Sequence, residues 1–180
     1  MNLLVTLDQN YFPRLQVLLT SVKINNPGEC FDLYLLHNHL PEQMLHSVRN
    51  WCEAAGYGYY PVQVEKQLFQ DAPASSRYPV EMYYRLLAPQ LLPQDVDRIL
   101  YLDPDTLVIN PVAGFWQTDL KGNLFAAAAH TGKTEFANGV NRIRLGVEHD
   151  YYNSGVLLMD LALGRKSCRK KFSGMWTSIG

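Results

Sequence analysis

The sequence contains, at residues 98–109, the segment RILYLDPDTLVI, in which two carboxylates directly follow a run of apolar residues. The apolar residues 99–102 indicate a strand that is buried on both faces. Pro104 fixes its own φ and has no backbone N–H, so the strand is expected to end there. Because open α/β sheets bind ligands at the carboxyl ends of their strands, Asp103 and Asp105 are predicted to converge at that edge.

Two converging carboxylates suit a hard divalent cation such as Mn²⁺ or Mg²⁺, which prefers oxygen ligands and normally also takes oxygens from a substrate phosphate. The sequence Asp103-Pro104-Asp105-Thr106 is also good turn chemistry, and short acidic motifs match by chance. From this segment alone, a metal site and an ordinary turn are both open interpretations.

The N-terminal part of the chain alternates between strand and helix patterns. Short apolar runs predict strands at 2–7, 31–36 and 57–64. Apolar residues at helical spacing predict helices that begin near Pro13 and Pro41. This βαβαβ order is that of the opening half of a nucleotide-binding α/β fold.

The patterns after these segments continue the same domain. Helical spacing predicts a helix over 80–91, and apolar runs predict strands at 125–129 and 151–161. Residues 67–79 are interpreted as a loop, and residues 132–148 as a loop with a short helix. No internal repeat or low-complexity segment is present.

Length and composition describe one globular domain. The 180 residues are 47% hydrophobic and 18% charged with a formal net charge of −1, which excludes a disordered chain and gives no support to a nucleic-acid partner. No signal peptide is expected after Met1, and no apolar run approaches the ~20 residues that span a bilayer. Cys30, Cys52 and Cys168 are widely spaced and fit reduced thiols. We therefore expect a cytoplasmic protein.

Polar residues that follow the first strand are candidates for nucleotide binding. Asp8 and Asn10 could hydrogen-bond a base edge or ribose hydroxyls, and Tyr11 could stack on a base. The alternative is an ordinary turn in which Asp8 caps the following helix.

Two further groups of residues have functional and structural interpretations. The Arg85 guanidinium suits phosphate or sugar oxygens, and its alternative is a solvated helix arginine. Asn153-Ser154-Gly155 would let a ligand approach the backbone, and its alternative is a bulge or turn before a strand. The five histidines show no metal-binding spacing.

The order and spacing of these motifs resemble glycosyltransferase family 8, the retaining transferases of the bacterial lipopolysaccharide galactosyl- and glucosyltransferase and glycogenin type. The matching segments are Leu7-Asp8-Gln9-Asn10-Tyr11, Leu19-Thr20-Ser21-Val22, Tyr84-Arg85-Leu86, Leu100-Tyr101-Leu102-Asp103-Pro104-Asp105 with Leu107-Val108, Phe115-Trp116, and Tyr152 to Leu161. The resemblance implies the α/β GT-A (nucleotide-diphospho-sugar transferase) fold, with a Rossmann-like, mostly parallel central sheet flanked by helices. It places an incomplete GT-A domain at 1–163 and a basic, irregular tail at 164–180.

The resemblance also implies a set of donor-binding residues. They are Thr6, Asp8, Asn10, Tyr11, Arg85, Asp103, Pro104, Asp105, Asn153, Ser154 and Gly155. Within this set, the residues that follow the first strand match those that hold uridine. Arg85 matches an arginine near the donor sugar and phosphates, and Asn153 matches an asparagine at the sugar. Asp103 and Asp105 match the carboxylates that bind Mn²⁺, which bridges to the UDP diphosphate.

The implied reaction moves galactose or glucose from a UDP-sugar to a glycan, lipopolysaccharide or lipid-linked saccharide with retention of configuration. A cation at the diphosphate neutralises the charge that develops on the leaving group. Retention implies front-face attack by the acceptor hydroxyl, so the protein mainly positions the reactants. No residue is assigned as a nucleophile.

The C-terminal part of the sequence departs from the family pattern. The His-x-x-Gly-x-x-Lys motif that typically supplies a third metal ligand is absent, because His130-Thr131-Gly132-Lys133 has another spacing. The Asp-Gln segment that helps place the acceptor is absent as well. We therefore expect a C-terminally truncated family member, and an inactive nucleotide-sugar-binding remnant is the alternative.

Two other interpretations concern the acidic motif and the tail. Phosphatases of the haloacid-dehalogenase type also place Asp-x-Asp-Thr after an apolar strand, with the first Asp as nucleophile, although usually near the start of the domain. The basic residues after Leu163 are interpreted first as a solvated tail, and contact with an anionic membrane surface at the inner face of the membrane is the alternative.

Overall fold

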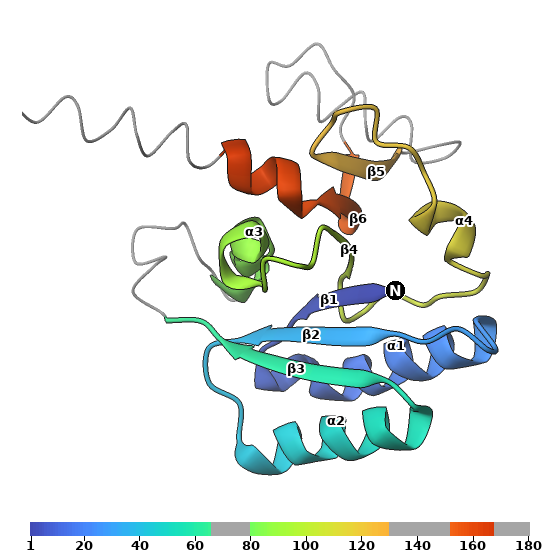
Figure 1. The fold of residues 1–180 in the computed structure, drawn as a ribbon. Helices are drawn as coiled ribbons and strands as arrows, with labels where there is room; N and C mark the ends of the chain where they lie inside the picture. Colours follow the sequence, from blue (N-terminus) through green and yellow to red (C-terminus); the bar gives the residue numbers. More distant parts are fainter. Residues whose placement is uncertain (66–79, 130–151, 168–180) are drawn as a thin grey trace, which may run out of the picture.

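The computed structural model describes residues 1–65, 80–129 and 152–167, which form an α/β domain around a central sheet (Figure 1). The strands are β1 (Asn2–Thr6), β2 (Asp32–His37), β3 (Gly58–Gln63), β4 (Arg98–Leu102), β5 (Phe125–Ala129) and β6 (Tyr152–Asp160). The α-helices are α1 (Phe12–Asn25), α2 (Glu42–Ala55), α3 (Ala88–Leu91) and α4 (Ala113–Trp116), and the 3₁₀ helices are η1 (Gln9–Tyr11) and η3 (Val80–Leu87). Residues 161–167 are helical and directly follow β6.

The order of the strands places two carboxyl ends side by side. The sheet order is β3-β2-β1-β4-β6-β5, in which β3, β2, β1 and β4 are parallel and β6 is antiparallel to both of its neighbours. The chain leaves β1 towards β2 and β3 and then returns to β4 on the other side. Leu3 pairs with Leu100, and Leu4 with Tyr101. The ends of β1 and β4 therefore form a topological switch point, where open α/β sheets bind ligands.

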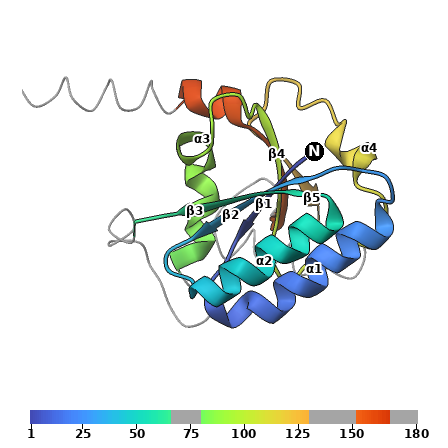
Figure 2. The same cartoon turned by 60° about the horizontal axis from the view of Figure 1, so that its bottom comes forward.

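Helices cover both faces of the sheet, which explains the continuous apolar runs in the central strands. Figure 2 shows α1 and α2 on one face, where they pack against alternate strand residues such as Leu3 and Leu100. The segments η3 and α3 lie on the other face, over residues such as Leu4 and Tyr101.

The local signals for the first two helices are confirmed. Pro13 lies in the first turn of α1, where a missing N–H costs nothing. Gly56 ends α2 in the left-handed region with φ of 74°, and its N–H donates to the carbonyls of Cys52 and Glu53.

One helical prediction needs correction, and one short helix was not predicted. Residues 80–91 were expected to form one helix, but residues 80–87 are 3₁₀-helical and only 88–91 are α-helical. The short helix α4 at Ala113–Trp116 has too few residues to show a period and was not predicted. The predicted loops at 67–79 and 132–148 lie outside the described residues.

The predicted start of an irregular tail at residue 164 is wrong for residues 164–167, which are helical. The physical reason is Arg165, whose guanidinium donates to the carbonyls of Pro89 at 2.9 Å, Pro93 at 2.7 Å, Gln94 at 3.1 Å and Val96 at 3.0 Å. These bonds fix the segment to α3 and the loop after it. The rest of the tail, residues 168–180, lies outside the described residues.

Within the described ranges, Cys30 and Cys52 are free thiols, as predicted, whereas Cys168 lies outside them. None of the helices in the described part of the chain has the length and apolar character needed to cross a bilayer.

Candidate functional site

At the carboxyl end of β1, Asp8 caps the turn that leads into α1. Its Oδ1 accepts hydrogen bonds from the backbone N–H groups of Asn10 at 2.7 Å and Tyr11 at 3.1 Å. The predicted cap is therefore present, and it holds Asn10 exposed at the switch point. The Tyr11 ring lies under the Arg14 guanidinium, whose carbon is 4.4 Å from the ring centroid.

At the carboxyl end of β4, Asp103 is held by both its backbone and its side chain. Its N–H donates to the Gly155 carbonyl at 2.7 Å, and its carbonyl accepts from Thr106 at 2.9 Å, which closes the predicted turn. Its Oδ1 accepts from an Arg85 terminal nitrogen at 3.2 Å and from the Tyr101 hydroxyl. The carboxylate is thus fixed in orientation while it remains 34% exposed.

Arg85 is buried, so its interpretation as a solvated helix arginine is wrong. Besides its bond to Asp103, its Nε donates to the Met82 carbonyl at 2.7 Å and its Nη1 to the Ser154 carbonyl at 2.6 Å. The guanidinium also lies 4.6 Å from the centroid of the Tyr101 ring. Arg85 therefore joins η3, β4 and β6 at the site.

Tyr101 is fully buried beneath this cluster. Its hydroxyl is within hydrogen-bond distance of Thr6 Oγ1, at 3.2 Å, as well as bonded to Asp103. Burial raises the pKa of Tyr101 above its ordinary value, and the Asp103 charge raises this pKa further. The phenol therefore stays protonated at neutral pH and can donate to the carboxylate.

The segment Asn153-Ser154-Gly155 lies near the start of β6, beside Asp103. Asn153 Oδ1 accepts from the Gly155 N–H at 2.7 Å. A Cβ on Gly155 would lie 2.6 Å from Asp103 Oδ2, so a side chain there would displace the carboxylate. The small residue predicted to admit a ligand thus makes room for Asp103.

Pro104 and Asp105 continue the turn towards α1. Pro104 is buried, whereas Asp105 is exposed. Both line a groove of about 410 Å³ whose other lining residues are Pro13, Arg14, Val17, Thr106 and Leu107. An exposed carboxylate, two residues along the chain from the anchored Asp103, therefore borders an open space.

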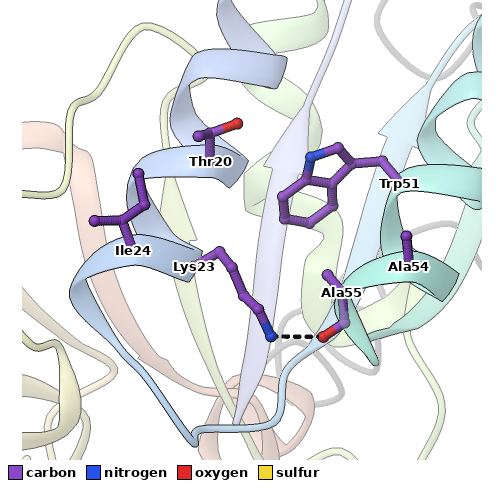
Figure 3. Close-up of a pocket in the computed structure, with 6 residues that line it drawn as sticks. All are labelled: Thr20, Lys23, Ile24, Trp51, Ala54 and Ala55. Atoms are coloured by element: carbon purple, nitrogen blue, oxygen red, sulfur yellow. Dashed lines mark hydrogen bonds between the residues drawn. The ribbon is translucent and has the colours of Figure 1, made fainter.

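A second hollow, of about 260 Å³, lies between the C-terminal halves of α1 and α2 (Figure 3). Its lining includes Ile24 and Trp51, and the Lys23 amine in it donates to the Ala55 carbonyl at 2.8 Å. The C-terminal ends of these helices lie at the amino ends of the parallel strands, away from Asp103.

Comparison with known proteins identifies the family. The model of Glycosyl transferase family 8 matches residues 2–176. This chain belongs to glycosyltransferase family 8. Membership removes the phosphatase interpretation of the acidic motif.

Individual relatives of this family 8 chain agree with the match. The lipopolysaccharide 1,2-glucosyltransferase of Escherichia coli (strain K12) is 26% identical over 165 residues, which cover 89% of this chain and 48% of that protein. General stress protein A of Bacillus subtilis (strain 168) is 28% identical over 106 residues, which cover 58% of this chain and 36% of that protein.

A solved structure confirms the predicted GT-A fold. The galactosyltransferase LgtC, in complex with donor and acceptor sugar analogs, superposes with a TM-score of 0.82 at 26% identity, covering 99% of this chain and 64% of that one. The family 8 chain thus spans less than two thirds of each of these relatives.

Asp103 and Asp105 are the candidate metal ligands of the predicted site. Among the described residues, no group of three or more His, Cys, Asp and Glu side chains could enclose a metal by itself. Asp103 and Asp105 supply two carboxylates, and Mg²⁺-type sites commonly combine one or two carboxylates with phosphate oxygens and water. A cation held by Asp103 and Asp105 would therefore need further ligands beyond these two carboxylates.

The Tyr101 hydroxyl and the contact between Gly155 and Asp103 are what sequence reasoning missed at this site. Tyr101 was counted as one residue of an apolar run. A signal was available, because a buried tyrosine hydroxyl usually needs a hydrogen-bond partner, and Tyr101 is the polar member of an aliphatic strand.

Proposed function

We propose that this chain is the donor-binding part of a metal-dependent retaining glycosyltransferase that moves galactose or glucose from a UDP-sugar to a saccharide acceptor. The observation that supports the proposal best is the pair at the end of β4, in which Asp103 is anchored and Asp105 is exposed. The GT-A domain that would carry this activity is assigned to residues 1–163 together with the docked helical residues 164–167.

The nucleotide is assigned to the end of β1. There Asn10 offers an exposed amide and Tyr11 an aromatic ring, while Asp8 uses Oδ1 for the cap. Within the described residues, Asp8 Oδ2 takes no hydrogen bond, which leaves it to a ribose or base donor. Thr6, buried just before this turn, supports the site through Tyr101.

The diphosphate is assigned to the end of β4. Asp103 and Asp105 would hold Mn²⁺ or Mg²⁺, which supplies charge neutralisation for the departing diphosphate. The nearby Pro104 keeps the two carboxylates on one turn, and Asn153 and Ser154 lie where the donor sugar would meet β6. These residues bind and orient the donor, and the acceptor hydroxyl is the nucleophile.

The acceptor class is inferred from the relatives. LgtC was solved with donor and acceptor sugar analogs, and the Escherichia coli relative is a lipopolysaccharide glucosyltransferase. A glycan or lipid-linked saccharide is therefore the proposed acceptor, and the net charge of −1 gives no support to a nucleic acid.

The test is a calorimetric titration of UDP into the 180-residue chain, with and without Mn²⁺. Mn²⁺ is expected to strengthen UDP binding in the wild type, and Asp105→Asn is expected to remove most of that gain. The matched control is Asp95→Asn, which changes an exposed Asp at the amino end of β4 and should retain the gain.

Turnover is then measured with UDP-galactose and UDP-glucose in the presence of Mn²⁺. Release of UDP that disappears in Asp105→Asn supports a transferase. Mn²⁺-dependent binding without turnover supports the alternative of a nucleotide-sugar-binding protein. A UDP affinity that is the same with and without Mn²⁺ would refute the metal site.

A further inference from the structure

The support of the Asp103 carboxylate is one-sided. Both side-chain hydrogen bonds that it accepts, from Arg85 and from Tyr101, end on Oδ1. In the described part of the chain, no hydrogen bond reaches Oδ2, which lies over the space left by Gly155. The 34% exposure of the side chain leaves this carboxylate accessible from outside.

The Tyr101 hydroxyl is a buried polar group that lies directly beneath the Asp103 carboxylate. Its ring is fully buried, it packs against the Arg85 guanidinium, and its hydroxyl lies between Thr6 and Asp103. A buried hydroxyl is costly unless it is hydrogen-bonded, and its bond to a carboxylate offsets that cost. Phenylalanine would fill the same space, so packing alone does not require the hydroxyl.

We propose that Tyr101 is a positioning residue: its hydroxyl, together with Arg85, holds Asp103 Oδ1 and thereby presents Oδ2 to a divalent cation. This inference rests on the proposed metal-dependent donor site. It also gives Arg85 a role in the support of Asp103, because its Nε and Nη1 bonds run to Asp103, Ser154 and Met82.

Loss of such a supporting hydrogen bond typically weakens metal affinity by about 10- to 100-fold, because the ligand must then be ordered when the metal binds. Tyr101→Phe removes only the oxygen and keeps the ring over Arg85. Its matched control is Tyr57→Phe, since Tyr57 is also buried and its hydroxyl has no hydrogen-bond partner among the described residues.

The experiment measures Mn²⁺ binding to the full chain by electron paramagnetic resonance in the presence of UDP, together with metal-free UDP binding and thermal unfolding. Tyr101→Phe is expected to weaken Mn²⁺ binding by about 10- to 100-fold and to leave metal-free UDP binding unchanged. Tyr57→Phe is expected to match the wild type in both binding measurements. In an Asp103→Asn background, Tyr101→Phe should have little further effect, because the two residues act through one carboxylate.

The possible results separate the two proposals. Wild-type Mn²⁺ binding that Tyr101→Phe does not weaken would overturn the role of Tyr101 and leave the donor site intact. Equal weakening of Mn²⁺ and metal-free UDP binding would assign Tyr101 a general structural role and overturn the inference. A wild-type chain that binds no Mn²⁺ with UDP would overturn the proposed function, and the inference with it.

Discussion

Gly155→Ala should disturb both the stability of the fold and the candidate metal site. The new Cβ would lie 2.6 Å from Asp103 Oδ2 and 3.0 Å from Asn153 Oδ1, whereas ordinary contacts begin near 3.4 Å. Relief requires that the Asp103 carboxylate rotate, which breaks its bonds to Tyr101 and Arg85, or that β6 move away, which breaks the 2.7 Å bond from Asp103 N–H to the Gly155 carbonyl.

Either route loses at least one hydrogen bond to a charged or backbone group. That loss, about 1.5–3 kcal/mol, agrees with the usual ~1–3 kcal/mol cost of overpacking a filled site. We therefore expect a decrease of about 2 kcal/mol in the free energy of unfolding, and a melting temperature lower by about 4 to 8 °C for a chain of this length. The Mn²⁺-dependent gain in UDP affinity should fall as well.

The assay combines urea denaturation with the UDP titration described above. The control is Gly114→Ala in α4, where a new Cβ meets nothing within 4 Å. Alanine there should be neutral or stabilising by up to about 1 kcal/mol, because it reduces the entropy of the unfolded chain. A Gly155→Ala protein with wild-type stability and wild-type Mn²⁺ response would refute the contact between Gly155 and Asp103.

Two other predictions concern the tail and a buried histidine. Arg165→Ala should lower the free energy of unfolding in urea by about 1–3 kcal/mol, because four carbonyls lose their donor. Lys166→Ala, at an exposed position, should change it by less than about 0.5 kcal/mol. Equal effects of the two substitutions would argue against the docked helix. Burial, and secondarily His39, lowers the pKa of His37 below 6.5, so the unfolded chain takes up the proton first as pH falls. The free energy of unfolding should therefore decrease as pH drops below 6.5, by at most about 1.4 kcal/mol per pH unit. In urea unfolding between pH 7 and 5, the free energy of unfolding should change less with pH for His37→Gln than for His46→Gln, the control at an exposed site. Identical pH slopes for the two variants would contradict the assignment of this pH dependence to His37.

Much of the architecture was predictable because its signals are local. The apolar runs of β1, β2 and β4 and the caps at Pro13 and Gly56 act within a few residues, and the structure has the elements they predict. The sequence predictions failed where the pattern was weak or short: the 3₁₀ conformation of η3 and the short helix α4 were not predicted.

The surroundings of the site depended on contacts between distant segments. Arg85 was ambiguous in the sequence because its partners lie 18 positions away, at Asp103, and 69 positions away, at Ser154. A helical period locates such a residue on one side of its helix, but it does not say which strand end lies opposite. The buried role of Arg85 follows only from the packing of η3 against the sheet.

For the pair Asp103 and Asp105, the sequence alone determined that two carboxylates follow a buried strand, because an apolar run and a proline fix where that strand ends. Only the tertiary structure decided that the two differ. Tyr101 reaches Asp103 from two residues earlier in the same strand, but only the packing of η3 and the pairing of β6 with β4 bring Arg85 and Gly155 to Asp103, while Asp105 stays exposed at a groove. The physical reason is that hydrogen bonds to a carboxylate depend on positions in space, which sheet pairing sets and residue spacing does not.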